Sequence, residues 1–480
     1  MSYYLGIDIG TTSVKAVAFS QEGRIIAKEN IGYELYHPQP GWSEQNPQEI
    51  LQATISSITS ILSKLNNAPA FISFSAAMHS LLAVDEQGTA LSPCIIWADN
   101  RAAAIAEKLR SSPAGQLFYQ DTGVPVHAMS PLCKLLWLKE NDQALFSSAY
   151  KFIGIKEYIL FHLTNKFIVD TSIASATGLL NLTSLQWHQP VLDYIGISSE
   201  QLPQIAAPLF TVYSNEQSTY LKGIPLIIGA SDGALANVGS DATADDTVAV
   251  TIGTSTAVRR ILPYIYTDEQ MRTFCYHLSD QQYVVGGGGN SGAVILQWLK
   301  DTVLKTSQSY EALFAAAENI PAGSEGLLFL PYLLGERAPI WNAYAKGVFF
   351  GIDIRHTQAH FVRAVMEGII YSVYSIGEIL LKQKDINTIY ATGGFTQSAA
   401  WVQMLSDMFN KTVIVSAAAE SSALGAVKLG LEALQITQSR SAEMTAVYKP
   451  NEANHIIYYE RFQKFERIYS LLKNEMSTPV

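Results

Sequence analysis

One local pattern occurs twice in this chain of 480 residues, at the N-terminus and just past the middle. Segments 5–19 and 248–258 each contain a β-forming run, a Gly-Thr pair with further hydroxyl residues, and a second β-forming run. A glycine at the tip lets the backbone turn tightly and approach a ligand. The hydroxyl and backbone N–H groups beside it can hold phosphate oxygens. Two such hairpins predict two domains that hold one polyphosphate, which favours an enzyme that uses ATP.

Taken alone, each segment is more simply interpreted as a plain β-hairpin, because Gly-Thr turns between strands are common. The presence of two hairpins gives the phosphate-binding interpretation equal standing, and Asp8 strengthens it. Asp8 ends an apolar strand, where an unpaired carboxylate would be costly to bury. An acid at the mouth of a phosphate-binding loop can hold Mg²⁺, directly or through water.

Length and composition limit the class of protein. A chain of 480 residues is too long for one hydrophobic core, so two or more domains are expected. Apolar residues make up 48% and charged residues 15%, as in a globular protein with an ample core. The net charge of −10 argues against general binding to nucleic acid or anionic membranes, which need a basic surface. A local cationic pocket would still accept an anionic small substrate.

The cysteines and the N-terminus indicate a cytoplasmic protein. Cys94, Cys133 and Cys275 are scattered and odd in number, which favours reduced thiols over a disulfide frame or a zinc site. The N-terminus leads into a strand with no basic region or signal-type apolar core. No uninterrupted apolar stretch is long enough to span a bilayer. We expect a small-molecule substrate and no nucleic-acid or membrane partner.

Strands and helices alternate in both halves, which predicts an α/β fold. A helix is expected over 47–65, with Asn46 as its N-cap and Pro47 in its first turn. A second, long helix is expected from Gln358 to about Lys382. The expected strands include 3–9, 14–19, 24–29, 70–76, 225–230, 247–252, 257–262 and 412–415.

A polar, acidic stretch before the second hairpin predicts the domain boundary. We expect an N-terminal domain over 1–245, with the first phosphate hairpin and the substrate side. A C-terminal domain over 246–435 would form the nucleotide side, followed by a helical extension over 436–480.

Asp232 is the strongest single candidate for catalysis. It lies where an apolar strand becomes a helix, between Ser and Gly. Loops at the carboxyl ends of strands carry the functional sites of α/β proteins. A carboxylate near helical N–H groups stays ionised and can accept a proton from a substrate hydroxyl. The alternative is an aspartate at a helix N-terminus with a structural role only.

Two loops of the first half could form the substrate side. Met78 and His79 follow a buried-type strand, and His79 can donate to a substrate oxygen or serve as a structural histidine. Segment 97–101 places an aromatic wall, Asp99 and Arg101 close together. The acid and the guanidinium can pair with each other, or they can reach polyol hydroxyls or a carboxylate.

Two glycine segments and two absent motifs limit the kinds of nucleotide site that the chain can form. The run 286–289 and the pair Gly393-Gly394 remove side chains where a nucleotide could lie close, although a flexible loop and a turn before a helix are equally good interpretations. The chain has no Walker-type P-loop, so it is not a Walker-type ATPase. No dinucleotide-binding fingerprint follows a first strand.

These features resemble the FGGY carbohydrate kinases, which have the two-domain, actin-like (ribonuclease H-like) ATPase fold. Segment 129–141 fits the first signature of that family, and 347–352 together with 360–367 fits the second. The resemblance extends from residue 3 to about 435. Within the family, the chain is most similar to gluconate kinases in segments 71–80, 97–101, 154–159 and 229–233. Xylulokinases share the Met-His pair and the Asp-Gly.

The resemblance implies a role for each matching residue. Asp8 would organise Mg²⁺, through water, and the transferring phosphoryl group, and Asp232 would be the general base. Met78, His79 and Asp99 would line the sugar site. The implied phosphate and nucleotide ligands are Gly10, Thr11, Thr12, Ser13, Lys15, Gly253, Thr254, Ser255, Gln297, Gly393, Gly394 and Ser398.

The sequence departs from some relatives at two places. Some have Asn where this chain has Ser398, at the implied adenine contact. Glycerol kinase has Arg-Glu at the Met78-His79 position, which argues against glycerol as the substrate.

We therefore expect ATP- and Mg²⁺-dependent phosphorylation of a small polyol acid, with D-gluconate and 6-phospho-D-gluconate as the implied substrate and product. The carboxylate of gluconate needs a cation or several donors, and His79, Arg101 and Lys156 are the candidates in that order. A xylulokinase or another sugar kinase of the family is the nearest alternative. An actin- or chaperone-type ATPase without a sugar substrate and a catalytically silent sugar sensor are more remote. The resemblance is compatible with a homodimer.

Overall fold

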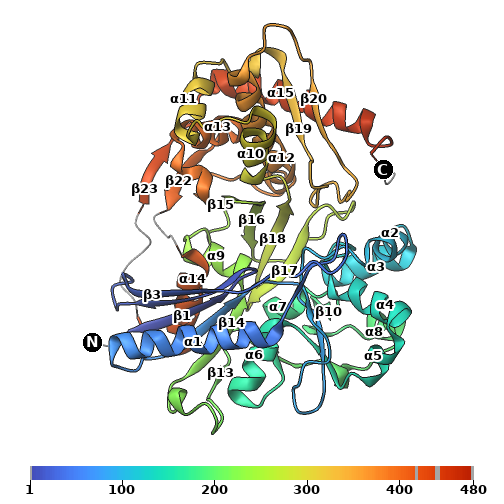
Figure 1. The fold of residues 1–480 in the computed structure, drawn as a ribbon, viewed down its shortest axis with the longest axis vertical. Helices are drawn as coiled ribbons and strands as arrows, with labels where there is room; N and C mark the ends of the chain where they lie inside the picture. The colour runs from blue at the N-terminus through green and yellow to red at the C-terminus, as the bar shows by residue number, and fades with distance from the viewer. Residues whose placement is uncertain (1–2, 417–419, 438–443, 477–480) are drawn as a thin grey trace. The chain divides into compact units, whose positions relative to one another are not determined.

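A computed structural model describes residues 3–416, 420–437 and 444–476 (Figure 1). Its contacts divide the chain into two compact units, and both are discontinuous in sequence, whereas the sequence predicted contiguous domains. Unit 1 comprises 1–241, 262–284 and 418–442, and unit 2 comprises 242–261, 285–417 and 443–480.

Unit 1 is built on a six-stranded sheet of order β13-β14-β5-β1-β2-β3. Strands β1, β5 and β14 are parallel, and β1, β2 and β3 form the antiparallel meander expected from the sequence. The strands are β1 (Tyr4–Ile9), β2 (Ser13–Phe19), β3 (Ile25–Gly32), β5 (Ile72–Ala76), β13 (Thr211–Val212) and β14 (Leu226–Ser231).

Helices cover both faces of this sheet, because alternate residues of its strands point to opposite sides. Val14, Ala16 and Ala18 of β2 belong to the apolar cluster that includes α1 (Pro47–Leu65). Val17 and Phe19 belong to the cluster that includes α14 (Ser421–Ala433). Helix α1 has the expected bounds, and the side chain of its N-cap Asn46 accepts from the backbone N–H of Gln48.

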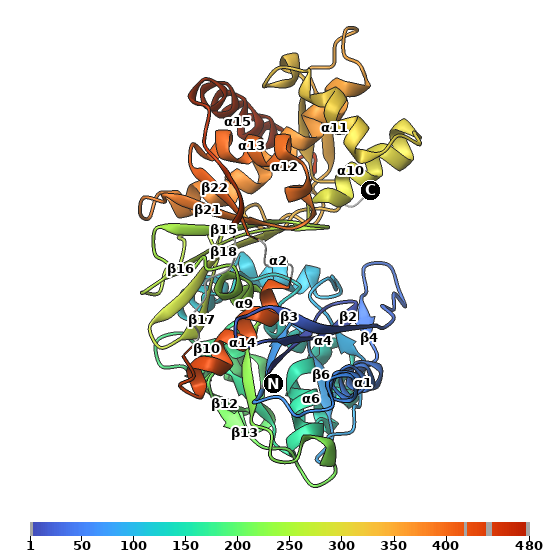
Figure 2. The same ribbon diagram turned by 90° about the vertical axis from the view of Figure 1, so that its left-hand side faces the viewer.

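Helix α14 packs unusually close to its neighbours in unit 1. It lies beside α9 (Asp232–Gly239), as Figure 2 also shows. A Cβ atom at Gly425 would lie 2.0 Å from the carbonyl oxygen of Leu235, and one at Gly6 would lie 2.4 Å from that of Ala423. Glycine is therefore required on both elements for α14 to pack against β1 and α9.

The remaining elements of unit 1 surround this core. The helices are α2 (Ala103–Arg110), α3 (Pro113–Thr122), α4 (Pro131–Asn141), α5 (Gln143–Ser148), α6 (Ile155–Thr164), α7 (Thr171–Ser175) and α8 (Gln189–Ile195). The strands are β4 (Glu44–Gln45), β6 (Leu82–Val84), β7 (Cys94–Ile95), β8 (Lys151–Ile153), β9 (Ile168–Asp170), β10 (Leu180–Asn181), β11 (Gln186–Trp187), β12 (Gln204–Ala206) and β17 (Phe274–Ser279). The three cysteines are free and buried.

Unit 2 repeats the local arrangement of unit 1. Strand β15 pairs with β16 in an antiparallel hairpin and with β21 in parallel, as β1 pairs with β2 and β5. Within this unit the sheet order is β18-β16-β15-β21-β22-β23. These strands are β15 (Thr247–Ile252), β16 (Thr256–Leu262), β18 (Gln282–Gly289), β21 (Thr388–Thr392), β22 (Thr412–Ser416) and β23 (Met444–Tyr448).

The long helix of unit 2, α12 (Gln358–Leu381), lies close to the bounds expected from the sequence. Among the residues that the structure describes, it is the one helix long and apolar enough to cross a membrane, but 89% of its apolar window is buried inside the protein. It packs on β19 (Leu328–Pro331), and its buried Arg363 pairs with Glu367 one turn later. Helix α12 is therefore a core helix.

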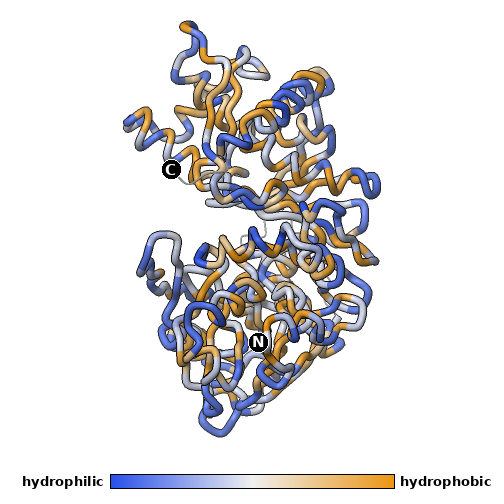
Figure 3. The backbone as a smooth tube through the Cα atoms, turned by 90° about the vertical axis from the view of Figure 1, so that its right-hand side faces the viewer, coloured by the Kyte–Doolittle hydropathy of each residue, from blue (hydrophilic) through white to orange (hydrophobic). Residues whose placement is uncertain are grey.

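Further elements complete unit 2. They are α10 (Ala293–Trp298), α11 (Tyr310–Glu318), α13 (Ala399–Phe409), α15 (Glu452–Leu472) and β20 (Gly347–Phe350). In each unit, hydrophilic segments lie mostly on the outside (Figure 3).

Candidate active site

Parallel strands of unit 1 end together at one edge of the sheet. Asp8, near the end of β1, lies opposite Ser75 of β5, and β14 is parallel to β5 on its other side. The Met78-His79 loop follows β5, and Asp232 follows β14. The pairing thus brings together three predicted site elements that are far apart in sequence, at the edge where α/β proteins bind ligands.

Asp232 lies close enough to Asp8 to influence the ionisation of Asp8. The hydroxyl of Ser75 donates to Oδ1 of Asp8 at 2.9 Å. Burial, and then the charge of Asp232, raise the pKa of Asp8 to about 7, while the Ser75 hydrogen bond and Lys15 act in the opposite direction. A divalent cation held by Asp8 would relieve this repulsion.

The donor set fits Mg²⁺. The residues that the structure describes contain no group of three or more His, Cys, Asp or Glu side chains that could hold a metal by themselves. Mg²⁺ at a nucleotide site usually binds one or two carboxylates and completes its shell with water and substrate phosphates. Asp8 would supply such a carboxylate, directly or through water.

Asp232 is the first residue of α9 and lies half-buried. Its Oδ1 accepts from the backbone N–H of Gly233 at 2.6 Å, and its carbonyl oxygen accepts from the Ser422 hydroxyl at 3.2 Å. The helix N-terminus stabilises the ionised form that a general base needs. The structure thus places the Asp232 carboxylate at the strand edge, and its role as a base stays a prediction.

Strand β14 has an irregularity shortly before Asp232. The register with β5 shifts between Ile227 and Ala230. Gly229, inside the shift, has φ 69°, and a Cβ atom there would lie 1.7 Å from the carbonyl oxygen of Phe74. Only glycine therefore fits this bulge.

The backbone of the first hairpin is held by two side chains from other segments. Its closing bond runs from the N–H of Gly10 to the carbonyl of Ser13 at 3.0 Å. The Tyr33 hydroxyl donates to the carbonyl oxygen of Gly10 at 2.5 Å. The side-chain amide of Gln45 donates to the carbonyl oxygen of Thr11, also at 2.5 Å. These bonds fix the backbone at the turn.

The Thr11 hydroxyl is oriented by Trp97. The indole N–H of Trp97 donates to Oγ1 of Thr11 at 2.9 Å. Because an indole N–H can only donate, the Thr11 oxygen acts as acceptor and its own hydrogen can be donated elsewhere. A phosphate oxygen would be a suitable acceptor. The neighbouring side chains of Thr12 and Ser13 are exposed and half-buried, respectively.

Lys15, predicted to lie near the phosphates, has an internal partner. Its Nζ lies 3.1 Å from Oε2 of Glu420, and Lys28 pairs with the other oxygen of the same carboxylate. Nothing in the sequence pattern links Glu420 to the first hairpin.

The second hairpin is also closed by a bond from its glycine N–H, but its turn is one residue shorter than that of the first. The N–H of Gly253 donates to the carbonyl of Ser255 at 2.9 Å, and the Thr254 side chain is exposed. The hydroxyls of Thr251 and Thr392 lie 2.9 Å apart and join β15 to β21 ahead of the glycine pair.

The predicted nucleotide residues of unit 2 lie on several elements. Gly393 has φ 102°, and a Cβ atom there would lie 2.4 Å from the carbonyl oxygen of Ile252, whereas one at Gly394 would meet nothing within 4 Å. Ser398 is the N-cap of α13 and accepts from the N–H of Trp401 at 3.3 Å. Gln297 is exposed on α10.

The glycine run 286–289 forms part of strand β18 rather than a flexible loop. A Cβ atom at Gly286 would lie 2.1 Å from the carbonyl oxygen of Val258, and one at Gly287 would lie 2.5 Å from the Cβ of Ala338. These two glycines therefore allow close packing inside unit 2.

His79 is held in a left-handed backbone conformation, with φ 69°. Its Nδ1 lies 2.8 Å from the carbonyl oxygen of Ala176, and its Nε2 lies 3.5 Å from the hydroxyl of Tyr276. When Nδ1 carries the proton donated to that carbonyl, Nε2 of the neutral ring is an acceptor. Met78 packs on the apolar cluster that includes Val169.

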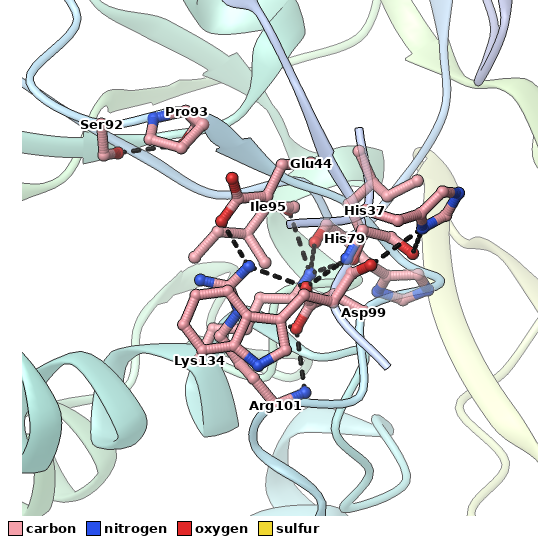
Figure 4. Close-up of polar contacts among 12 residues, drawn as sticks. His37, Glu44, His79, Ser92, Pro93, Ile95, Asp99, Arg101 and Lys134 are labelled. Atoms are coloured by element: carbon pink, nitrogen blue, oxygen red, sulfur yellow. Dashed lines mark hydrogen bonds and ion pairs between the residues drawn. The ribbon is translucent and has the colours of Figure 1, made fainter. Parts of the chain in front are cut away.

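Asp99 and Arg101 pair with each other, which is one of the two arrangements that the sequence allowed (Figure 4). Nε and one terminal nitrogen of Arg101 contact the two oxygens of Asp99 at 2.9 and 2.8 Å, and that nitrogen also donates to Glu44 at 2.5 Å. The guanidinium carbon lies 3.7 Å from the ring centroid of Trp42. The Arg101 side chain is only 4% exposed, so its charge is largely used inside the protein.

Lys156 also has an internal partner. It pairs with Asp170, and both side chains are buried. Asp170 in turn caps α7 by accepting from the N–H of Ile173 at 2.9 Å. The two cations other than His79 predicted to meet a substrate carboxylate are thus each neutralised by a carboxylate of the protein.

Sequence reasoning assigned no role to several residues at this edge. Ser75, Glu420, Tyr276 and Lys134 are the clearest examples. For Lys134 a signal was available, because a lysine within the otherwise apolar stretch 131–138 is an unusual core residue. For the others no local pattern indicated a partner.

The sequence matches family models and known kinases over most of its length. Family models described as the N-terminal and C-terminal domains of the FGGY family of carbohydrate kinases match residues 3–239 and 248–434. A gluconokinase from Bacillus subtilis (strain 168) is 44% identical over 450 residues, which cover 90% of this chain and 88% of that protein. A xylulose kinase from the same strain is 29% identical and covers 99% and 98% of the two chains.

Solved structures share the whole fold. A gluconate kinase from Lactobacillus acidophilus superimposes with a TM-score of 0.95 and 37% identity, and covers 98% of each chain. A ligand-bound xylulose kinase from the same species has a TM-score of 0.95 and 36% identity, and covers 98% of this chain and 99% of that one. The two-domain, actin-like α/β class predicted from the sequence is confirmed.

Proposed function

The chain belongs to the FGGY family of carbohydrate kinases, and from this premise we propose that it transfers the γ-phosphoryl group of ATP to D-gluconate, forming 6-phospho-D-gluconate. The observation that carries the choice of substrate is the 44% identity to the gluconokinase, against 29% to the xylulose kinase of the same strain.

Asp232 acts as the general base in this proposal. It takes the proton of the terminal hydroxyl of the substrate as that oxygen bonds to the γ-phosphorus, while the bond to the β–γ bridging oxygen breaks and ADP leaves. Its position at the N-terminus of α9, at the same strand edge as Asp8, supports this role. Asp8 would hold Mg²⁺, directly or through water, and the ion neutralises phosphate charge when bound.

The two hairpins hold the phosphates in this proposal. Thr11, Thr12, Ser13 and Lys15 would bind from unit 1, and the oriented Thr11 hydroxyl supports that assignment. From unit 2, phosphate would contact Gly253, Thr254 and Ser255. The nucleotide would lie along Gly393 and Gly394, where the open space above Gly394 supports close approach, and near Gln297 and Ser398.

His79 is the proposed polyol contact, beside Met78. A neutral ring would accept from a substrate hydroxyl through Nε2, and an imidazolium would donate to the substrate carboxylate. Arg101 and Lys156 stay predicted carboxylate ligands, although their internal ion pairs favour a supporting role. The buried, free cysteines support the cytoplasmic location.

A xylulokinase is the second candidate. The observation that favours it is the ligand-bound xylulose kinase structure, which is nearly as similar in sequence as the gluconate kinase structure. ADP release with Mg-ATP against D-gluconate, D-xylulose, L-ribulose, glycerol and no sugar separates the two. Turnover on D-gluconate above all others supports the proposal. A preference for D-xylulose would refute the gluconate assignment. Equal ADP release with every sugar and without sugar would refute the proposed sugar kinase activity.

A further inference from the structure

Lys134 of α4 is a buried lysine whose contacts are backbone carbonyls. Its Nζ donates to the carbonyl oxygens of His79 at 2.5 Å, Ile96 at 2.8 Å and Ile95 at 3.2 Å. Figure 4 shows the amine pointing towards His79 and Ile95. An ammonium group has three N–H donors, so three carbonyl acceptors use all of them.

The three acceptors belong to the two loops on the predicted substrate side. His79 follows β5 in a left-handed conformation that a non-glycine residue adopts only under constraint. Ile95 and Ile96 lead directly to Trp97, which orients the Thr11 hydroxyl, and to the Asp99–Arg101 pair. One side chain therefore joins the backbone beside the His79 ring to the segment that contacts the phosphate hairpin.

Burial of the charged Lys134 side chain costs free energy. Burial lowers its pKa to about 7, Asp99 acts in the opposite direction, and Arg101 adds to the lowering. Among the described residues it has no carboxylate within ion-pair distance. An apolar side chain of similar length would avoid the cost of burying a charge, but it would leave three carbonyl oxygens without this donor.

We propose that Lys134 is a positioning residue for substrate recognition, which holds the 78–79 and 95–101 loops in the geometry that binds the polyol. It acts through the backbone of His79 and Ile96 and does not touch the substrate. The inference rests on the proposed sugar-kinase function and extends it to a residue outside the binding surface.

The test is a set of kinetic measurements on K134M, which keeps the length of the side chain and removes its donors. We expect the KM for D-gluconate to rise about tenfold or more, since a charged donor to buried carbonyls is lost. The KM for ATP should change less than about twofold, because Lys134 reaches the phosphate hairpin only indirectly, through Trp97 and Thr11. K134R, which keeps the charge and the donors, should recover part of the affinity.

K139M is the matched control. Lys139 lies on the same helix and its Nζ donates to one backbone carbonyl, that of Ile195, which is not part of either loop. We expect K139M to keep the wild-type KM for both substrates. A K134M protein that folds, with a thermal transition near that of K139M and an unchanged KM for D-gluconate, would overturn the proposal.

Two further experiments complete the test. If K134M does not fold, the KM values for D-gluconate and for ATP are measured in K134Q, which keeps two N–H donors on a shorter side chain. Equal changes in the two KM values would overturn the proposal. In a double-mutant cycle, K134M should raise the KM for D-gluconate less in an H79A background than in the wild type, whereas additive effects contradict action through His79. Failure of the wild-type enzyme to turn over D-gluconate would instead refute the proposed function.

Discussion

At the scale of single residues, the proposed chemistry of unit 1 depends on two carboxylates at the same strand edge. Asp8 is held by Ser75 and affected by Asp232, and Asp232 is anchored at the start of α9. Each has a different task in the proposed reaction. Asp8 faces the phosphate side, and Asp232 takes the substrate proton.

The D232N variant tests the base. Asparagine keeps the size of the side chain but cannot accept a proton at this position, so we expect turnover with D-gluconate to fall about 10²–10⁴-fold. ATP should still bind nearly as well, because its proposed ligands remain. ADP release gives the first quantity and nucleotide titration the second. Near-normal turnover would show that another group is the base.

The raised pKa of Asp8 predicts a pH dependence of stability. Its folded pKa, about 7, lies above the ordinary pKa of an aspartate, 3.8, so the native state holds a proton that the unfolded state releases between those values. This contribution to stability is fully present below about pH 4 and is lost as the pH rises through 7.

The comparison with D8N isolates that contribution. Without Mg²⁺, the thermal transition of D8N should gain on that of the wild type as the pH rises from 4 to 8, because asparagine carries no charge that is buried or that repels Asp232. A difference that stays constant over this range would contradict the raised pKa of Asp8.

At the scale of elements, the site depends on how tightly α14 packs against α9. Gly425 and Gly239 remove the side chains that would separate the two helices, and Ser422 of α14 bonds to the backbone of Asp232. The position of the proposed base is therefore set partly by a helix almost two hundred residues later in the chain.

The G425A variant tests this packing. The added methyl group would lie 2.0 Å from the carbonyl oxygen of Leu235, a backbone atom that cannot move aside without shifting α9. We expect a loss of about 1–3 kcal/mol in the free energy of unfolding, measured by urea denaturation, and a lower kcat. S422A is a milder change on the same helix and should cost about 1 kcal/mol. Wild-type stability in G425A would show that α14 has room to move.

At the scale of the whole molecule, the chain repeats one device in both units, a hairpin beside a parallel strand. Each unit supplies its own phosphate-binding turn in the proposal. The match to the gluconate kinase structure over 98% of both chains shows that this organisation is retained throughout.

Ligand binding should therefore stabilise the full chain. At a free D-gluconate concentration of about 100 times Kd, mass action predicts about 2.7 kcal/mol of added stability, visible as a rise in the thermal transition. Glycerol at the same concentration is the control and should give a smaller rise. Equal shifts with both compounds would count against a polyol-acid site.

Local patterns in the sequence were sufficient to predict many of the secondary-structure elements and the family of this protein. The two hairpins, the capped helix α1 and the long helix α12 follow from turn residues, caps and apolar periodicity, all of which act over a few residues. The signature segments identified the family, and Asp8, His79 and Asp232 were placed at strand ends by the same local reasoning.

Only the tertiary structure decided which charges are used internally. Arg101 contacts Glu44, Lys156 contacts Asp170, Lys15 contacts Glu420, and Lys134 contacts the carbonyls of three residues. It also assigned residues from distant segments to the same unit. The physical reason is that ion pairs and buried hydrogen bonds depend on distance in space, and chain segments far apart in sequence leave no periodic signal of where they meet.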